Sequence, residues 1–210
     1  GNDDIEITEL VNDSRKVCEG SVFVCISGAV VDGHNFVEDV CAKGAAAVIV
    51  EKEVEAPANV TVIKVEDTRY ALALTSAAYF GYPADQLKVI GITGTKGKTT
   101  TTYMIKKILE KTEKKVGLVG TIATYIGDKK LEDSDRTTPE SLELQGLFYK
   151  MAKAKCEYVV MEVSSQSLKL SRVEGCNFDY GIFTNLYKDH ISLKEHADMN
   201  EYFETKLKLF

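Results

Sequence analysis

The chain has 210 residues, 44% of them hydrophobic, and a formal net charge of -6. This length can hold one large domain or two small ones with packed cores, and the acidic balance argues against a protein that mainly coats nucleic acid or an anionic membrane. Because no apolar run reaches the roughly 20 residues that a spanning helix needs, and no secretory signal is apparent, we expect a soluble, cytoplasmic protein.

The first part of the chain alternates short β-rich segments with helical ones, as small α/β units do. The predicted elements are strands over 21–26, 45–50 and 59–65 and a helix over 35–43. A helix rich in alanine and leucine is predicted over 68–79, and Gly81-Tyr82-Pro83 ends it. We place a domain boundary near residues 83–88, so that residues 1–85 form an N-terminal domain.

The second part, residues 86–210, has the pattern of a larger α/β domain. A predicted strand over 88–93 is followed by a glycine turn and a helix. The apolar face of that helix is expected to carry Met104, Ile105, Ile108 and Leu109. The later elements are strands over 116–120, 158–163 and 180–184 and a helix over 141–154. Strands separated by helices favour a parallel sheet with right-handed crossovers.

The last residues keep a helical spacing up to the end of the sequence. Tyr202, Phe203, Lys206, Leu207 and Phe210 recur at that spacing, and no glycine, asparagine or proline stop signal follows. We interpret the second domain as incomplete.

The sharpest chemical signal is Gly94-Thr95-Lys96-Gly97-Lys98-Thr99-Thr100, between a predicted strand and a predicted helix. Glycines let backbone N–H groups turn inward around phosphates, and a helix N-terminus adds positive potential. Lys98 can reach the outer phosphates, and the Thr99 hydroxyl can bind Mg²⁺. The general pattern has a glycine five residues before Gly97, where Ile92 stands. We predict a phosphate-binding loop, and the alternative is a glycine turn with a solvated lysine.

Two polar positions are expected at the carboxyl edge of the same sheet, where ligands collect in open α/β folds. Glu162 ends the strand that contains residues 159–161 and could hold Mg²⁺ directly or through water. Taken alone, a strand-end glutamate is solvated more often than not. His190 follows the strand that ends at residues 183–185, although a lone histidine is usually structural or exposed.

Several segments in the right order resemble the Mur ligases across nearly all 210 residues, and among them the ligase that adds the third residue to UDP-N-acetylmuramoyl-L-alanyl-D-glutamate. The segments are Asp13-Ser14-Arg15-Lys16-Val17, Gly20-Ser21-Val22-Phe23-Val24, Asp32-Gly33-His34-Asn35-Phe36, residues 94–100, Thr137-Thr138-Pro139, Met161-Glu162-Val163-Ser164-Ser165, Thr184-Asn185-Leu186 and Tyr202-Phe203-Glu204-Thr205-Lys206. The resemblance implies a small N-terminal α/β domain that binds the UDP substrate. A P-loop ATP-binding domain with a mostly parallel sheet would follow, incomplete here, and the C-terminal ligase domain would be absent.

The resemblance also implies roles for individual residues. ATP and Mg²⁺ are the implied cofactors, and a UDP-N-acetylmuramoyl-dipeptide and an amino acid are the implied partners. The implied substrate-binding residues are Ser14 and, within the loop 28–33, Ala29, Val30 and Val31 for the UDP end, and Thr137, Thr138, Ser164 and Arg172 for the muramoyl-dipeptide. Thr99 and Glu162 match ligands of one Mg²⁺ and His190 a ligand of a second. Lys206 matches a lysine carbamoylated by CO₂, and Lys98, His190 and Lys206 form the implied catalytic set.

The implied reaction transfers a phosphoryl group from ATP to a substrate carboxylate, and an amino group then attacks the acyl phosphate. Without the C-terminal domain, this chain alone is not expected to turn over. Three features depart from the family pattern: Gln166 replaces a frequent histidine, Leu170 replaces a polar residue, and segment 191–199 is longer.

Two alternatives remain open from the sequence. The first is another amide ligase of the same superfamily, similar to folylpolyglutamate or cyanophycin synthetases. The second is a non-catalytic nucleotide-binding scaffold that keeps the fold and has lost the reaction. Neither the amino acid that is added nor the oligomeric state is indicated by the sequence.

Overall fold

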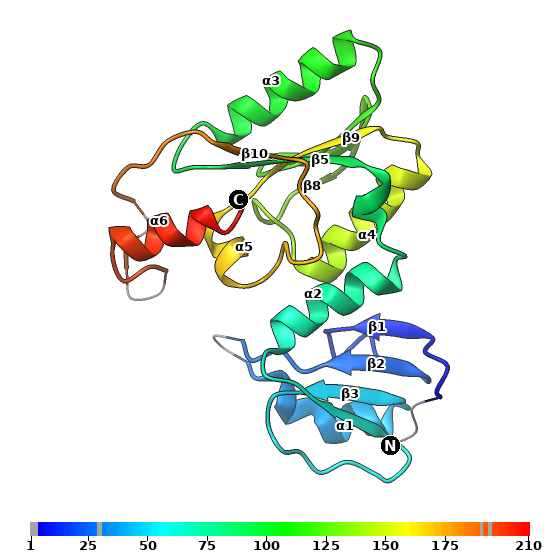
Figure 1. Cartoon of the computed structure of the whole chain (residues 1–210). Helices are drawn as coiled ribbons and strands as arrows, with labels where there is room; N and C mark the ends of the chain where they lie inside the picture. The colour runs from blue at the N-terminus through cyan, green and yellow to red at the C-terminus, as the bar shows by residue number, and fades with distance from the viewer. Residues whose placement is uncertain (1–3, 29–30, 190, 193–194) are drawn as a thin grey trace. The chain divides into compact units, whose positions relative to one another are not determined.

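The computed structural model describes residues 4–28, 31–189, 191–192 and 195–210, which divide into two compact units, Gly1–Tyr79 and Phe80–Phe210 (Figure 1). Both units are mixed α/β structures, as predicted. No helix among the described residues is long and apolar enough to cross a membrane.

The first unit is built on a parallel sheet with the strand order β1-β2-β3-β4. The elements are β1 (Glu9–Val11), β2 (Ser21–Val24), η1 (Gly33–Phe36), α1 (Val37–Ala42), β3 (Ala47–Val50), β4 (Thr61–Lys64) and α2 (Thr68–Tyr79). The central strands β2 and β3 are buried along their whole length, as strands inside a parallel sheet usually are. Strand β1 was not predicted because three residues are too few to show a period.

The second unit contains a six-stranded sheet with the order β10-β5-β9-β6-β7-β8. Its elements are η2 (Pro83–Gln86), β5 (Lys88–Thr93), α3 (Lys98–Lys111), β6 (Val116–Val119), β7 (Ala123–Ile126), β8 (Lys129–Asp133), α4 (Ser141–Lys153), β9 (Tyr158–Glu162), α5 (Ser165–Lys169), β10 (Tyr180–Phe183) and α6 (Met199–Leu207). The first four strands of that order are parallel, and β7 and β8 add an antiparallel hairpin. The hairpin was not predicted because β8 is exposed throughout and so shows no apolar alternation.

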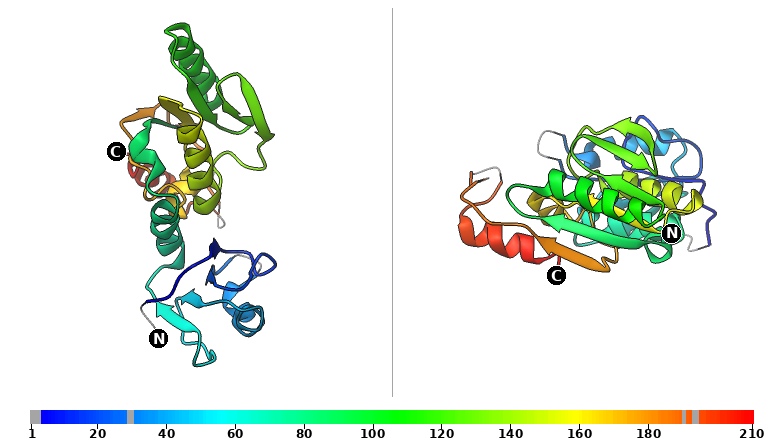
Figure 2. Two further views of the ribbon diagram at one scale, coloured as in Figure 1. Left: turned by 90° about the vertical axis from the view of Figure 1, so that its right-hand side faces the viewer. Right: turned by 90° about the horizontal axis from the view of Figure 1, so that it is seen from above.

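Alternate residues of the central strands enter two different cores. Val89 and Met161 pack in a cluster with the apolar residues of α4, whereas Ile92 and Val160 pack in a cluster with those of α3. Since successive side chains of a strand point to opposite faces, α3 and α4 cover opposite faces of the sheet (Figures 1 and 2). This three-layer arrangement leaves the carboxyl ends of the parallel strands as the open edge of the unit.

The predicted apolar face of α3 is only half correct. Ile105 and Leu109 pack against the core, but Met104 and Ile108 are 59% and 62% exposed. The buried positions include Thr102 instead, whose hydroxyl donates to two carbonyl oxygens of the preceding turn at 2.7 and 3.1 Å. A polar residue can replace an apolar one in the core where such partners are available.

Candidate functional site

Residues 94–100 connect β5 to the N-terminus of α3, and their backbone needs glycine at two points. Gly94 has a φ of 138°, and Gly97, which caps α3, has a φ of 85°. A Cβ at Gly94 would lie 2.0 Å from the Thr184 hydroxyl oxygen, so no side chain fits there. Thr100 lies in the first turn of α3. The loop therefore has the geometry that phosphate binding requires, an open turn that leads into a helix N-terminus.

The segment after β10 holds this loop in place. The Thr95 and Lys96 N–H groups donate to the Asn185 carbonyl and side-chain oxygens, each at 3.0 Å. The Thr184 hydroxyl and the Asn185 amide in turn donate to the Lys96 carbonyl at 2.8 and 3.0 Å. The Tyr202 hydroxyl donates to Thr95 Oγ1 at 3.2 Å. Asn185 and Tyr202 thus position the loop, a role that the sequence did not assign to them.

The structure brings together two of the predicted Mg²⁺ ligands. The Thr99 hydroxyl donates to Glu162 Oε2 at 2.9 Å, and the Thr121 N–H donates to Oε1 at 2.8 Å. Glu162 is 1% exposed, which differs from the solvated strand-end glutamate that base rates favour. A hydroxyl and a carboxylate suit Mg²⁺, which prefers oxygen ligands and keeps several waters.

The second Mg²⁺ site was predicted from His190 alone. His190, like Ala29 and Val30, lies outside the described residues. Within the described part of the chain, no three His, Cys, Asp or Glu side chains lie close enough together to hold a metal ion. Thr99 and Glu162 would offer Mg²⁺ two oxygen ligands, a set that phosphate and water oxygens can complete.

Two lysines converge on one carbonyl oxygen of the loop. Lys98 Nζ donates to the Gly94 carbonyl at 2.9 Å, and Lys206 Nζ, from α6, donates to the same oxygen at 3.0 Å. Lys206 is 1% exposed, and its ammonium lies 4.5 Å from the centre of the Tyr202 ring. Burial lowers the pKa of Lys98, and burial together with the nearby Lys98 charge lowers the pKa of Lys206 to about 8, against the attraction of Asp189. Lys206 is thus partly neutral near neutral pH.

This buried amine predicts a pH dependence of stability. Its folded pKa of about 8 lies below the ordinary value of 10.5, so the folded state loses its proton first as pH rises. The free energy of unfolding should therefore increase between about pH 8 and pH 10.5. Lys206→Met should lose this increase and be more stable than the unsubstituted chain at pH 7 by roughly 1–2 kcal/mol, because an apolar group fills a buried site.

Denaturant unfolding of this chain at several pH values measures the effect, with the exposed Lys208→Met as the control. Equal pH dependence in the unsubstituted chain and Lys206→Met would contradict a depressed pKa at Lys206.

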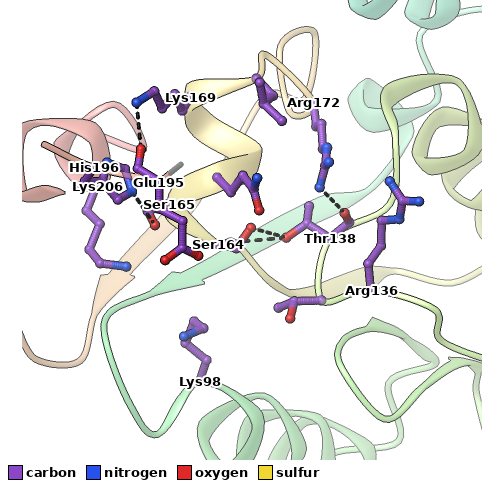
Figure 3. Close-up of a pocket in the computed structure, with 13 residues that line it drawn as sticks. Lys98, Arg136, Thr138, Ser164, Ser165, Lys169, Arg172, Glu195, His196 and Lys206 are labelled. Carbon is purple, nitrogen blue, oxygen red and sulfur yellow. Dashed lines mark hydrogen bonds between the residues drawn. The ribbon is translucent and has the colours of Figure 1, made fainter. Parts of the chain in front are cut away.

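A cavity of about 340 Å³ adjoins the two lysines (Figure 3). Its lining includes all the residues predicted to grip the dipeptide, namely Thr137, Thr138, Ser164 and Arg172, and also Gln166 and Leu170, where the sequence departs from the family pattern. Thr138 is central: its hydroxyl donates to the Glu162 carbonyl at 2.9 Å and accepts from the Ser164 N–H at 3.1 Å. The departures at Gln166 and Leu170 therefore lie at the predicted dipeptide site itself.

The cavity is mainly cationic. Its charged lining residues are Lys98, Arg136, Lys169, Arg172 and Lys206, with Glu195 as a carboxylate. Arg136 and Arg172 both pair with Glu140, at 2.7 and 2.8 Å. Positive charge in a partly enclosed site favours carboxylate and phosphate ligands. The sequence analysis did not assign Arg136, Lys169 or Glu195, because their positions carry no motif.

The other predicted substrate residues lie in the first unit. The Ser14 carbonyl accepts from Lys43 Nζ at 2.9 Å, and Val31 is 54% exposed. The loop 28–33 is closed by the Gly28 N–H, which donates to the Val31 carbonyl at 2.9 Å. His34 fixes its far end, since Nε2 accepts from the Glu51 N–H and Nδ1 lies 2.6 Å from Asp32. These contacts fix the two ends of the loop, and the ligand of the loop and of Ser14 stays a prediction.

Comparison with known proteins places these features in a family. The description "Mur ligase family, catalytic domain" matches residues 6–80, and "Mur ligase middle domain" matches residues 92–210. Proteins named UDP-N-acetylmuramoyl-L-alanyl-D-glutamate--2,6-diaminopimelate ligase are 52% identical in Clostridium perfringens (all of this chain, 43% of that protein) and 53% identical in Clostridium botulinum (98% and 42%). The chain spans less than half of the length of these relatives.

Solved structures show the same similarity. A structure titled as that diaminopimelate ligase is 29% identical, with a TM-score of 0.82 over 97% of this chain and 40% of its own. MurF from Acinetobacter baumannii is 25% identical, with a TM-score of 0.63 over 98% of this chain and 41% of its own.

Proposed function

Since the chain belongs to the Mur ligase family, we propose that the protein containing it is an ATP-dependent amide ligase that acts on UDP-N-acetylmuramoyl-L-alanyl-D-glutamate. The observation that carries this proposal is the convergence of a phosphate-loop lysine, the Thr99 and Glu162 pair and a cationic cavity at one sheet edge. Such a site can hold a phosphate donor and an anionic acceptor side by side.

Each group has a distinct task in this mechanism. Lys98 and the N-terminus of α3 bind and orient the ATP phosphates, and Thr99 and Glu162 hold Mg²⁺. Bound Mg²⁺ supplies charge neutralisation for the transferring phosphoryl group. Arg172 and Thr138 orient the acceptor, whose carboxylate oxygen takes the phosphoryl group. No protein nucleophile is needed, because the carboxylate itself attacks phosphorus and ADP leaves.

Lys206 is the proposed carbamoylation site. Its partly neutral amine can attack the carbon of CO₂, and loss of the N–H proton to solvent then leaves a carbamate. The resulting negative charge would replace a buried cation next to Lys98, which matches the surroundings better. We propose that this carbamate supports Lys98 and the metal during phosphoryl transfer.

The incoming amino acid is proposed from the relatives. Their names specify 2,6-diaminopimelate, which we take as the first candidate, with lysine as the alternative. We propose that residues 1–85 hold the UDP end of the acceptor through Ser14 and the loop 28–33.

The direct test is ligation by the full-length protein with ATP, Mg²⁺, UDP-N-acetylmuramoyl-L-alanyl-D-glutamate and either amino acid. Mass spectrometry should detect the tripeptide product, with one ADP and one phosphate released for each amide formed. UDP-N-acetylmuramoyl-L-alanine, which lacks the accepting glutamate, is the matched control and should give no product. Absence of product with both amino acids, while ATP and the acceptor bind, would contradict the proposal.

A further inference from the structure

The turn that follows β6 lies against the carboxylate of Glu162. Strand β6 pairs in parallel with β9, with Val119 opposite Met161, so Gly120 comes next to Glu162 at the carboxyl edge of the sheet. Glycine permits this close approach, because a Cβ at Gly120 would lie 2.5 Å from Glu162 Oε1. The residue after it, Thr121, therefore lies where both its backbone and its hydroxyl reach the carboxylate.

Thr121 holds both oxygens of this carboxylate. Its N–H donates to Glu162 Oε1 at 2.8 Å, and its hydroxyl donates to Oε2 at 3.2 Å. Among the residues that the structure describes, one further hydrogen bond reaches the carboxylate, from the Thr99 hydroxyl to Oε2 at 2.9 Å. Residues that hydrogen-bond to a metal ligand fix its orientation and so tune the affinity for the metal. Thr121 is thus placed to orient the predicted Mg²⁺ ligand Glu162.

The same hydroxyl reaches the lining of the cationic cavity. Thr121 Oγ1 lies 3.1 Å from Oγ1 of Thr137, which lines that cavity. One hydroxyl proton cannot serve both neighbours, and a carboxylate is the stronger acceptor because it is charged. When the Thr121 proton lies on the Glu162 side, the Thr137 hydroxyl donates to Thr121. The three side chains then form one chain of hydrogen bonds that runs from the cavity to Glu162.

This chain gives a ligand in the cavity a route to the carboxylate. A hydroxyl that donates its proton keeps lone pairs that can accept, so Thr137 suits a donor group of the ligand, such as a peptide N–H. Hydrogen bonds in a chain polarise and strengthen one another. A ligand that donates to Thr137 would therefore strengthen the bond from Thr121 to Glu162, and the effect is reciprocal because coupling between two binding sites always is.

We propose that Thr121 is a positioning residue that orients Glu162 for Mg²⁺ and, through Thr137, couples Mg²⁺ binding to binding of the acceptor. The inference rests on the proposed function, which supplies both Mg²⁺ with ATP and an acceptor that carries peptide N–H groups. Thr121 is not among the described residues that line the cavity, so it acts through its two neighbours.

Thr121→Val in the full-length protein tests both parts of this role, because valine keeps the N–H and the side-chain shape but lacks the hydroxyl. The measurement is calorimetric titration with a non-hydrolysable ATP analogue and Mg²⁺, with and without UDP-N-acetylmuramoyl-L-alanyl-D-glutamate. In the unsubstituted protein, the acceptor should tighten binding of the Mg²⁺ complex about fivefold. In Thr121→Val this ratio should fall to about one, and the Mg²⁺ complex should bind on the order of 10-fold more weakly.

Titration of the analogue in EDTA separates the metal from the phosphates. Without Mg²⁺, Thr121→Val and the unsubstituted protein should bind the analogue equally, because Lys98 and the loop at residues 94–100 are unchanged. Thr121→Ser keeps the hydroxyl and should restore most of the affinity and of the coupling ratio. Thr112→Val, at the far end of α3, removes the hydroxyl of an exposed threonine and should behave as the unsubstituted protein.

The outcomes distinguish the role of Thr121 from the proposed function. Unchanged affinity for the Mg²⁺ complex or an unchanged coupling ratio in Thr121→Val would overturn the role of Thr121. The absence of coupling in an unsubstituted protein that binds both ligands would also overturn it. Failure of the unsubstituted protein to bind the nucleotide or the acceptor would instead contradict the proposed function.

Discussion

Replacing Lys98 by alanine should reduce ligation by the full-length protein about 1000-fold or more. Lys98 Nζ lies 2.9 Å from the Gly94 carbonyl at the mouth of the loop, within reach of the outer phosphates of a nucleotide bound there. Removing one preorganised donor from a transferring charge costs on the order of 100- to 1000-fold, and Lys98 also keeps Lys206 partly neutral. The loss should therefore exceed that of a single hydrogen bond.

The measurement is the rate of tripeptide formation at saturating ATP, together with the unfolding midpoint. Lys111→Ala, at the opposite end of α3, is the matched control because it removes an exposed lysine from the same helix. A scaffold that only binds nucleotide would show no ligation before or after the substitution. Its binding to a partner would survive the substitution. Retention of most of the ligation rate in Lys98→Ala would show that another group contacts the transferring phosphate.

Gly94→Ala should both destabilise the second unit and abolish nucleotide binding. The added Cβ would meet the Thr184 hydroxyl oxygen at 2.0 Å and backbone atoms of Asn185 at 3.1 Å, and the φ of 138° is itself unfavourable for alanine. Overpacking and backbone strain together should cost roughly 3 kcal/mol of unfolding free energy. Because Thr184 and Asn185 also hold Lys96, their displacement should open the loop.

Gly97→Ala provides the comparison within the same loop. Its φ is also positive, at 85°, but nothing lies within 4 Å of its added Cβ, so only about 1 kcal/mol of backbone strain is expected. Denaturant unfolding of the two variants and calorimetric titration with ATP test the difference. Equal destabilisation by the two substitutions would indicate that the contact with Thr184 relaxes at little cost.

Local sequence patterns predicted most of the regular elements. The bounds of α2 and β5 agree with the predictions over 68–79 and 88–93 because each element carries its own periodic pattern and a clear breaker. The prediction that Met104 and Ile108 lie on the buried face of α3 was wrong. Apolar spacing cannot reveal that Thr102 and Lys106 find buried partners on that helix. The hairpin of β7 and β8 lacks a burial pattern altogether.

The sequence by itself determined the α/β class, the position of the loop at residues 94–100 and the family resemblance, because each of these depends on the order of neighbouring residues. Only the tertiary structure decided which groups that are far apart in the sequence come into contact. Thr99 and Glu162 are 63 residues apart, and Lys206 and Gly94 are 112 apart, yet both pairs are in hydrogen-bond contact. The physical reason is that strand order and helix packing, which depend on the whole core, bring these ends to one edge of the sheet. The same packing buries Lys206, lowers its pKa and places Glu195 at the cavity wall.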